Sequence, residues 1–481
     1  MSLTVKNLKN FIKELVPLTK KELPKFLCLT FMMFLITYIH NILKISKDTL
    51  IISHVGAENI SALKMWLVAP SSVIFMLIYI RLTDFLSRSR LFHLLSWFLL
   101  SYFILFAWFL YPNRHALVIN YFQNIASSGS SFRYLATIVA NWHYSLFFLF
   151  SEMWITLMYT ISVWEMTNHI TSTQEAKRLY PIFGITGQSG LMMASILAKK
   201  FVVSETNWQL ALNKTIASVA ISGVLLSLTL IILGKIVGIQ LLNNKESSTD
   251  SKTKPKTKPS IFSSLKCITT SKTVLLITSI IFCYSFTISL IEGLWKKSMG
   301  LNFAHNPNQI QYFIGNVDLY ISLLSISFAL IGSYLIKTIK WRTSMLITPI
   351  TAIIVGSIFF IFMLKATKVS TTSSSLALTA AMYAGAIYVI VVRAIKHTLF
   401  DTTKEISYMS LDSDLKTKGK AAAEMIGARF GKGGSSFAQQ ILLMVCSGST
   451  LLGLTPIFAV IYFIVMFCWL RSSYLLGSQK N

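Results

Sequence analysis

Ionisable side chains lie inside stretches that are otherwise apolar enough to cross a membrane. Glu152 lies in LFFLFSEMWITLMY, and the segment HNILKISKDTLIIS carries Lys44, Lys47 and Asp48 at helical spacings of three and four that share one face. A charge in hydrocarbon costs several kcal/mol, so such groups must be paired, protonated or turned toward water. They are therefore the first candidates for a site that binds or moves a charged ligand.

Each of these groups also has a structural interpretation. Lys44, Lys47 and Asp48 could form a cluster at the membrane interface, with side chains that reach into the headgroup region. Glu152 lies near the middle of its stretch among apolar neighbours, where a carboxylate has to be protonated or paired. For Glu152 a functional role is the favoured interpretation.

The second half of the chain carries similar charges. Glu292 precedes Lys296 by four residues in SLIEGLWKKSMG, which is the order that favours an ion pair within one helix. Arg393 and Lys396 lie close to the inner end of another apolar stretch, where anchoring at the interface explains them as well as ligand contact does. Both interpretations stay open for these four residues.

A long charged segment, FDTTKEISYMSLDSDLKTKGKAAAEMIGARFGKGGSS (400–436), runs into a predicted membrane helix. Its candidate ligand-binding cations are Lys418, Lys420 and Arg429. Helical spacing also places a charge pair and then a strip of small residues on one face, which predicts close packing against another helix. That face consists of Lys420, Glu424, Gly427, Gly431 and Gly434. The glycines have three residues between them where a phosphate-binding loop needs four, so such a loop is not predicted.

Composition indicates the class of protein. Of 481 residues, 54% are hydrophobic and only 13% are charged, which is typical of a polytopic membrane protein. The five cysteines are scattered and the HExxH and GxSxG motifs are missing, so no enzyme, cofactor or metal site is expected. We attribute the net charge of +26 to Lys and Arg in cytoplasmic loops, and expect no nucleic-acid partner.

Apolar stretches of membrane-spanning length predict an all-α protein with about twelve transmembrane helices in two six-helix bundles. Lys and Arg concentrate in the loops on the side of the amino terminus, which predicts that both termini are cytoplasmic. The predicted parts are a tail 1–25, a bundle 26–242, a basic cytoplasmic linker 243–272, a bundle 273–471 and a tail 472–481.

The embedded charges fall in the first, fourth, seventh and tenth predicted helices. In the major-facilitator architecture these helices line the central cavity, so the arrangement is analogous to that fold. Lys and Arg there would complement phosphates, and the carboxylates would pair with these cations in an empty site or carry a proton. An anionic substrate is therefore expected. Several aromatic residues could stack on a base, although packing explains most of them: Trp142, Trp154, Trp164, Trp295 and Tyr284.

Several blocks in order along the chain resemble the nucleotide transporters of obligate intracellular bacteria and plastids, typified by the ATP/ADP translocases. The last block is the longest and most specific. The blocks are SKDTLIIS (46–53), LKMWLVAPSSVIFMLIY (63–79), SEMW (151–154), EAKRLYPIFG (175–184), IEGLWK (291–296) and LFDTTKEISYMSLDSDLKTKGKAAAEMIGARFGKGG (399–434).

The resemblance implies a twelve-helix, multi-pass carrier of the bacterial inner membrane that exchanges ATP and ADP and serves energy parasitism, as a monomer in the bilayer. An alternative is net import of nucleoside triphosphates, or of GTP, UTP or NAD, by proton symport. The family's functional positions match Lys47, Glu152, Glu292 and one lysine of Lys418 and Lys420. Together with the cations chosen on physical grounds, the predicted substrate-binding residues are Lys44, Lys47, Glu152, Glu292, Lys296, Arg393, Lys396, Lys418, Lys420 and Arg429.

Three departures from the family pattern indicate a diverged paralogue. Lys44 occupies a position that is usually Arg, SEMWI replaces the commoner SELWG, and Pro181 follows EAKRLY.

Overall fold

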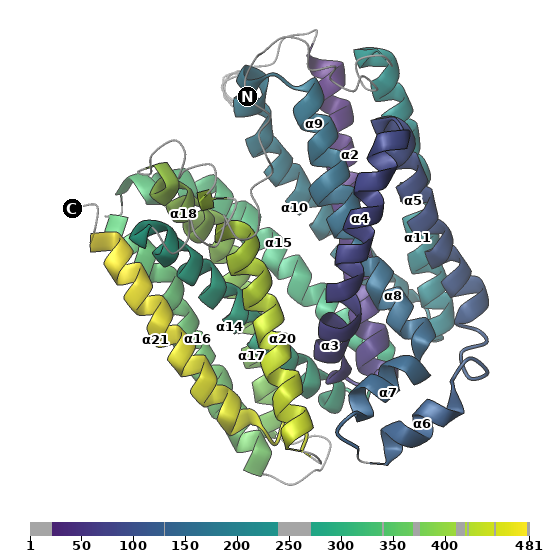
Figure 1. Cartoon of the computed structure of the whole chain (residues 1–481), viewed down its shortest axis with the longest axis vertical. Helices are drawn as coiled ribbons and strands as arrows, with labels where there is room; N and C mark the ends of the chain where they lie inside the picture. The colour runs from purple at the N-terminus through teal and green to yellow at the C-terminus, as the bar shows by residue number, and fades with distance from the viewer. Residues whose placement is uncertain are drawn as a thin grey trace, which may run out of the picture. The chain divides into compact units, whose positions relative to one another are not determined.

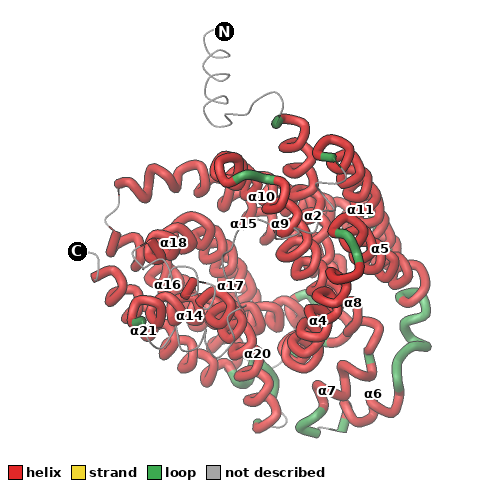
Figure 2. The backbone as a smooth tube through the Cα atoms, turned by 45° about the horizontal axis from the view of Figure 1, so that its top comes forward, coloured by secondary structure: helices red, strands yellow, loops and turns green. Residues whose placement is uncertain are grey.

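The computed structural model describes residues 22–128, 130–238, 271–338, 341–368, 376–409, 419–420, 423–446 and 449–478. Within these ranges the chain consists of helices joined by loops, without a strand (Figure 2). Ten helical stretches there are long and apolar enough to cross a membrane. The predicted class, an all-α polytopic membrane protein, is confirmed.

The predicted count of about twelve spans includes two further stretches, near 180–203 and 424–446, and both are helical. They are α10 (Thr173–Ser204) and the π-helix η6 (Ala423–Gly427) with α20 (Ala428–Val445). Both carry more small and polar residues than the ten apolar spans, as expected for helices that pack on protein rather than on lipid.

Packing divides the chain into two compact units, which we describe separately. The first comprises residues 1–47, 72–114 and 149–251. Figure 1 labels the α-helices of this unit. Its elements are α2 (Leu23–Leu50, up to residue 47), α4 (Ala69–Phe85, from residue 72), α5 (Arg88–Leu105), η3 (Phe106–Leu110), the last residues of α8 (Trp142–Met153), η4 (Trp154–Val163), α9 (Trp164–Ile170), α10 and α11 (Trp208–Val237).

Helix α10 in the first unit has a well-defined start and a close neighbour. Its N-cap Ser172 accepts a hydrogen bond from the Glu175 amide, and the Glu175 carboxylate accepts one from the Ser172 amide. Such a capping box satisfies two amides that the first helical turn leaves without partners. Further along, Asn41 of α2 donates hydrogen bonds to the Leu191 carbonyl and the Ser195 hydroxyl of α10, which ties the two helices together.

The second unit comprises residues 48–71, 115–148 and 252–481. Helix α14 lies against α17, α20 and α21, and α16 lies against α17 and α21 (Figure 1). Its elements are η1 (Ile51–Val55), α3 (Asn59–Ala62), η2 (Leu63–Val68), α6 (Asn120–Ser127), α7 (Arg133–Ala140), most of α8, α14 (Lys272–Asn302), α15 (Pro307–Thr338), α16 (Trp341–Lys368), α17 (Leu376–Ile395), η5 (Lys396–Phe400), α18 (Asp401–Met409), η6, α20 and α21 (Thr455–Ser478).

These units differ from a simple division of the sequence into halves. Residues 48–71 and 115–148 precede the predicted linker, yet they pack with the second unit. The predicted tail 1–25 is described only from residue 22, and the predicted linker 243–272 only at its last two residues. Helix α21 continues to Ser478, past the predicted bundle end at residue 471.

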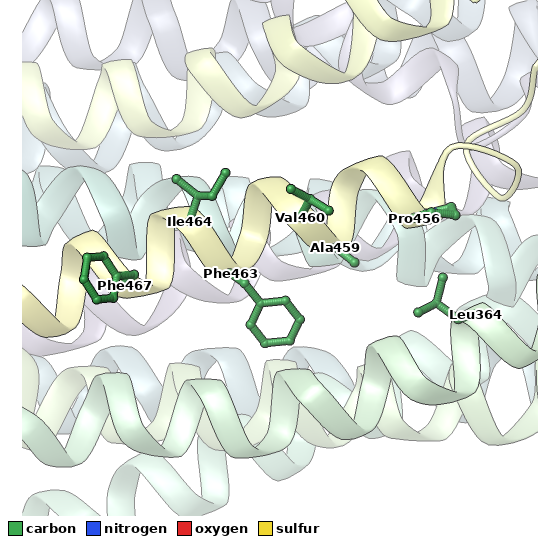
Figure 3. Close-up of a pocket in the computed structure, with 7 residues that line it drawn as sticks. All are labelled: Leu364, Pro456, Ala459, Val460, Phe463, Ile464 and Phe467. Atoms are coloured by element: carbon green, nitrogen blue, oxygen red, sulfur yellow. The ribbon is translucent and has the colours of Figure 1, made fainter.

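An apolar groove of about 600 Å³ runs along α21 opposite the end of α16 (Figure 3). Its lining is aliphatic and aromatic, as on other helix surfaces that face lipid chains. Such a lining is suited to contact with lipid chains. The lining residues are Leu364, Pro456, Ala459, Val460, Phe463, Ile464 and Phe467.

The contact between α2 and α10 generates a stability prediction. A Cβ atom at the buried Gly190 would lie 2.5 Å from the backbone oxygen of Phe34, whereas one at the exposed Gly184 on the same helix would meet nothing within 4 Å. Gly190→Ala should therefore destabilise the protein by about 1–3 kcal/mol, the usual cost of overpacking. Thermal unfolding of the purified protein in detergent measures this. Gly184→Ala is the matched control and should unfold at or above the parent temperature, since Ala is the better helix former; equal midpoints for the two variants would contradict the close contact.

Candidate functional site

Lys47 and Glu152 form an ion pair inside the first unit. The Lys47 ammonium on α2 lies 3.0 Å from a carboxylate oxygen of Glu152 on α8, and the two side chains are 5% and 29% exposed. A charge in a membrane helix is tolerated when it is paired within the protein. The requirement that Glu152 be protonated or paired is thus met by pairing, and Lys47 lies in the protein interior, not in a cluster at the interface.

A π-helix directly follows Glu152. In η4 the backbone hydrogen bonds span five residues, an arrangement that is often found at functional sites. Trp154 at its start is fully buried and donates a hydrogen bond from its indole nitrogen to the Ile36 carbonyl of α2, at 3.3 Å. This contact holds the turn that carries Glu152 against the helix that carries Lys47.

In the second unit, Glu292 and Lys296 have separate partners. Glu292 on α14 forms an ion pair with Arg393 on α17, and Lys296 forms one with Asp48 at 2.8 Å. The intrahelical Glu292–Lys296 pair that their spacing suggested is therefore replaced by two pairs between distant segments. Asp318 on α15, only 6% exposed, adds a second negative charge that acts on Arg393.

Lys396 and Asp401 pair across the π-helix η5. The Lys396 ammonium lies 2.8 Å from the Asp401 carboxylate, five residues further along the chain. Residues five apart lie on different sides of an α-helix, but the wider π-turn brings them back to one side. The π-helix is thus the local reason that Lys396 has an acidic partner close to the end of α17.

The acidic groups of α18 and η6 surround Lys404. Its ammonium contacts Asp401 at 3.3 Å and Glu424 at 2.7 Å. Burial opposes the charge of Lys404, but the negative charges of Asp401 and Glu424 outweigh this effect and raise the pKa of its ammonium group above the ordinary value. Lys420 pairs with Glu405 at 2.6 Å. The Lys420–Glu424 pair suggested by helical spacing is therefore replaced by two pairs to α18.

The remaining predicted cations are less enclosed. Lys44 is half-buried on α2, and Arg429 is exposed on α20. Lys418 lies outside the described residues. The structure thus brings most of the predicted site residues into ion pairs, and does so separately in each unit.

The predicted strip of small residues does support close helix packing. A Cβ atom at Gly427 would lie 3.0 Å from the Thr278 carbonyl oxygen, and one at Gly431 would lie 2.6 Å from the Phe282 carbonyl oxygen. Both neighbours belong to α14, so η6 and α20 lie close against α14 at these two positions. At Gly434 the nearest atoms are 3.8 Å away, an ordinary contact.

Beside these helices the second unit encloses a small polar cavity of about 10 Å³, which is room for about one water molecule. Glu292 and Lys296 of α14 both line it, together with Lys64 of η2 and Gln439 of α20. Of the aromatic candidates, Trp295 serves packing: its side chain is 3% exposed and donates a hydrogen bond to the Met382 carbonyl.

Several charged residues beside Glu292, Lys296 and Arg393 were not singled out from the sequence, among them Glu58, Lys297 and Asp318. A sequence feature could have identified Asp318, because it is a carboxylate inside an apolar stretch. The same criterion selected Glu152. Glu58 and Lys297 had no such feature, because each lies near the end of an apolar stretch, where charges are common.

The ion pairs of the two units are suited to bind an anionic ligand by exchange of partners. Cations in low-dielectric surroundings are neutralised by carboxylates, and an anionic ligand can replace those carboxylates, with Arg393 able to offer a bidentate fork. Within the described ranges, no group of three His, Cys, Asp or Glu side chains is placed to hold a metal ion.

Solved structures similar to this one are membrane transporters. A D-xylose–proton symporter superposes with a TM-score of 0.56 at 11% identity, over 94% of this chain and 97% of that one. The nucleoside transporter NupG superposes with a TM-score of 0.52 at 12% identity, over 95% and 100%. At such identities the likeness concerns the fold alone, which is that of the major facilitators.

Sequence comparison identifies the family. ADP,ATP carrier protein 3 of Rickettsia felis is 32% identical over 95% of both chains, and ADP,ATP carrier protein 1 of Rickettsia bellii is 33% identical over 96% of this chain and 95% of its own. ADP,ATP carrier protein 4 of Rickettsia typhi is 31% identical over 97% and 93%. The TLC ATP/ADP transporter model matches residues 1–479. This chain belongs to the TLC ATP/ADP transporter family.

Proposed function

We propose that this protein exchanges ADP and ATP across the bacterial inner membrane by alternating access. The observation that carries the proposal is the set of ion pairs inside membrane-spanning helices of a TLC family chain, in particular Lys47–Glu152 and Glu292–Arg393. We further propose a monomer in which two six-helix bundles, 26–242 and 273–471, are joined by a cytoplasmic linker, and in which both termini are cytoplasmic, as the positive charge of the inner loops favours.

In the proposed mechanism the carboxylates take the place of the ligand when the carrier is empty. Nucleotide phosphates then displace them and bind the freed ammonium and guanidinium groups, which keeps each cation paired throughout the cycle. The residues proposed to contribute to binding are Lys44, Lys47, Glu152, Glu292, Lys296, Arg393, Lys396, Lys418, Lys420 and Arg429.

A transport assay tests this function. The full chain is reconstituted in proteoliposomes, and uptake of labelled ATP is measured with ADP, with another nucleotide or with only buffer inside. Exchange predicts rapid uptake that depends on internal ADP or ATP and is insensitive to protonophores. Uptake into empty vesicles that a protonophore abolishes would contradict exchange and support net import with protons.

The pair Lys47–Glu152 generates the next prediction. Glu152→Gln keeps the volume and a hydrogen-bond acceptor but removes the negative charge that balances Lys47. We expect the variant to fold and its exchange rate to fall by about tenfold or more, as for a disrupted charge pair at a binding site. Glu205→Gln is the control: Glu205 lies before the apolar span Trp208–Val237 and pairs with the half-exposed Lys214, so the variant should exchange like the parent. An unchanged rate and pH profile in Glu152→Gln would leave this carboxylate with a structural role only.

The cations of α20 and the segment before it generate a separate prediction. If Lys420 and Arg429 bind phosphates, their contribution should grow with the number of phosphates, because each added charge strengthens the attraction. Single Ala substitutions should therefore weaken triphosphate binding more than monophosphate binding, by about 1–3 kcal/mol when a charged hydrogen bond is lost. Arg429→Lys should restore binding only in part, since Lys lacks the planar fork. Competition by unlabelled mono-, di- and triphosphates measures this, and equal losses for all three ligands would assign the two residues to helix packing or gating.

A further inference from the structure

Two consecutive lysines of α14 hold the segment 48–62, which we call the clamp segment. Lys296 pairs with Asp48 at 2.8 Å, and Lys297 pairs with Glu58 at 2.6 Å. All four side chains are at most 14% exposed. Asp48 lies at the end of α2 and Glu58 just before α3, so the two pairs hold both ends of π-helix η1, which lies between them.

Other contacts hold the same segment against the second unit. Gln440 of α20 donates hydrogen bonds to the Glu58 carbonyl at 3.2 Å and to the Ser61 hydroxyl at 2.7 Å. A Cβ atom at Gly300 of α14 would lie 2.9 Å from the Ile52 side chain, so η1 lies directly on that helix. By sequence, the clamp segment belongs to the first predicted bundle, and the chain on both sides of residues 48–71 belongs to the first unit.

Lys296 differs from Lys297 in one respect. It lines the polar cavity that Glu292 also lines, whereas neither Lys297 nor its partner Glu58 does. The ammonium group of Lys296 therefore lies at the junction of the clamp segment and the proposed nucleotide site. A phosphate that bound Lys296 would place a second negative charge beside the buried Asp48 carboxylate, and like charges repel strongly in low-dielectric surroundings.

We infer that Asp48 couples nucleotide binding to release of the clamp segment. It is a positioning residue: in the empty carrier its carboxylate holds Lys296 and with it the segment 48–62, and nucleotide phosphate competes for the same ammonium group. The ion pair between Lys297 and Glu58 also keeps the segment bound, and the ligand does not reach this pair. This inference rests on the proposed function and gives a reason for obligate exchange, because a carrier without nucleotide keeps the clamp segment bound.

Thiol labelling of the clamp segment tests the coupling. Ala62 on α3 is fully buried and does not line the cavity, so Ala62→Cys reports release of the segment without being shielded by ligand. The full chain, with its five natural cysteines replaced by Ser, is purified in detergent and labelled with a maleimide, alone and with ATP, ADP or adenosine. ATP and ADP should raise the labelling rate by about fivefold or more through a shift between two conformations, and adenosine, which has no phosphate, should leave it unchanged.

Variants separate the contributions of the two ion pairs, Lys296–Asp48 and Lys297–Glu58. Asp48→Asn should label fast with and without nucleotide, and Asp48→Glu should restore slow labelling in the absence of ligand. Glu58→Gln should also label faster than the parent, yet it should still respond to ATP, because Lys296 and Asp48 remain. Glu205→Gln, the control, should behave like the parent in every condition.

Several outcomes would overturn the inference. Two results would show that Asp48 does not keep the segment bound until phosphate releases it. They are slow labelling of Asp48→Asn and a labelling response to adenosine equal to the response to ATP. If Asp48→Asn does not fold, the response of the parent to ATP and the response of Glu58→Gln decide the question. Failure of the parent to exchange nucleotides in proteoliposomes would refute the proposed function, while fast ligand-free labelling of Asp48→Asn would still show that Asp48 holds the segment.

Discussion

The high cost of an unpaired charge away from water is the constraint on which this structure depends. Lys47, Lys296 and Arg393 lie in helices that are otherwise apolar, and each has a carboxylate partner from another part of the chain. Such pairs contribute little net stability, but the loss of one partner is strongly unfavourable. A ligand that replaces one partner can therefore enter without leaving a bare charge, and a neutral ligand cannot.

Much of this arrangement is predictable from the sequence, and the limits have a physical cause. Glu152 stands out because a carboxylate among apolar neighbours cannot remain unpaired, and that criterion uses only local sequence. Its partner Lys47 is more than a hundred residues away, so pairing depends on how α2 and α8 pack. The length and apolarity of the spans likewise predict the fold class. The packing of residues 48–71 with the second unit depends on contacts between distant segments, which local sequence patterns do not predict.

Local rules fail where a tertiary partner competes with them. The spacing of Glu292 and Lys296 favours a pair within α14, but such a pair contributes only about 0.2–0.5 kcal/mol. Partners from other helices satisfy both charges at once: Arg393 pairs with Glu292, and the buried Asp48 pairs with Lys296. The glycine strip of α20 was predictable for the opposite reason, because helix geometry alone determines which small residues share a face.

The π-helix between Arg393 and Asp401 lets this segment hold one extra residue without turning the helix that follows. A π-turn accommodates one residue more than an α-helical turn does, so deletion of a single residue from 397–400 would restore an ordinary helix. Lys396 and Asp401 would then be four residues apart in an α-helix and would still lie on one side. Conversion of the π-turn to α-helix without a deletion would instead rotate α18 by about 100° relative to α17 and turn Asp401, Lys404 and Glu405 away from their present partners. The shape of the turn, and not only its side chains, therefore sets which charges meet.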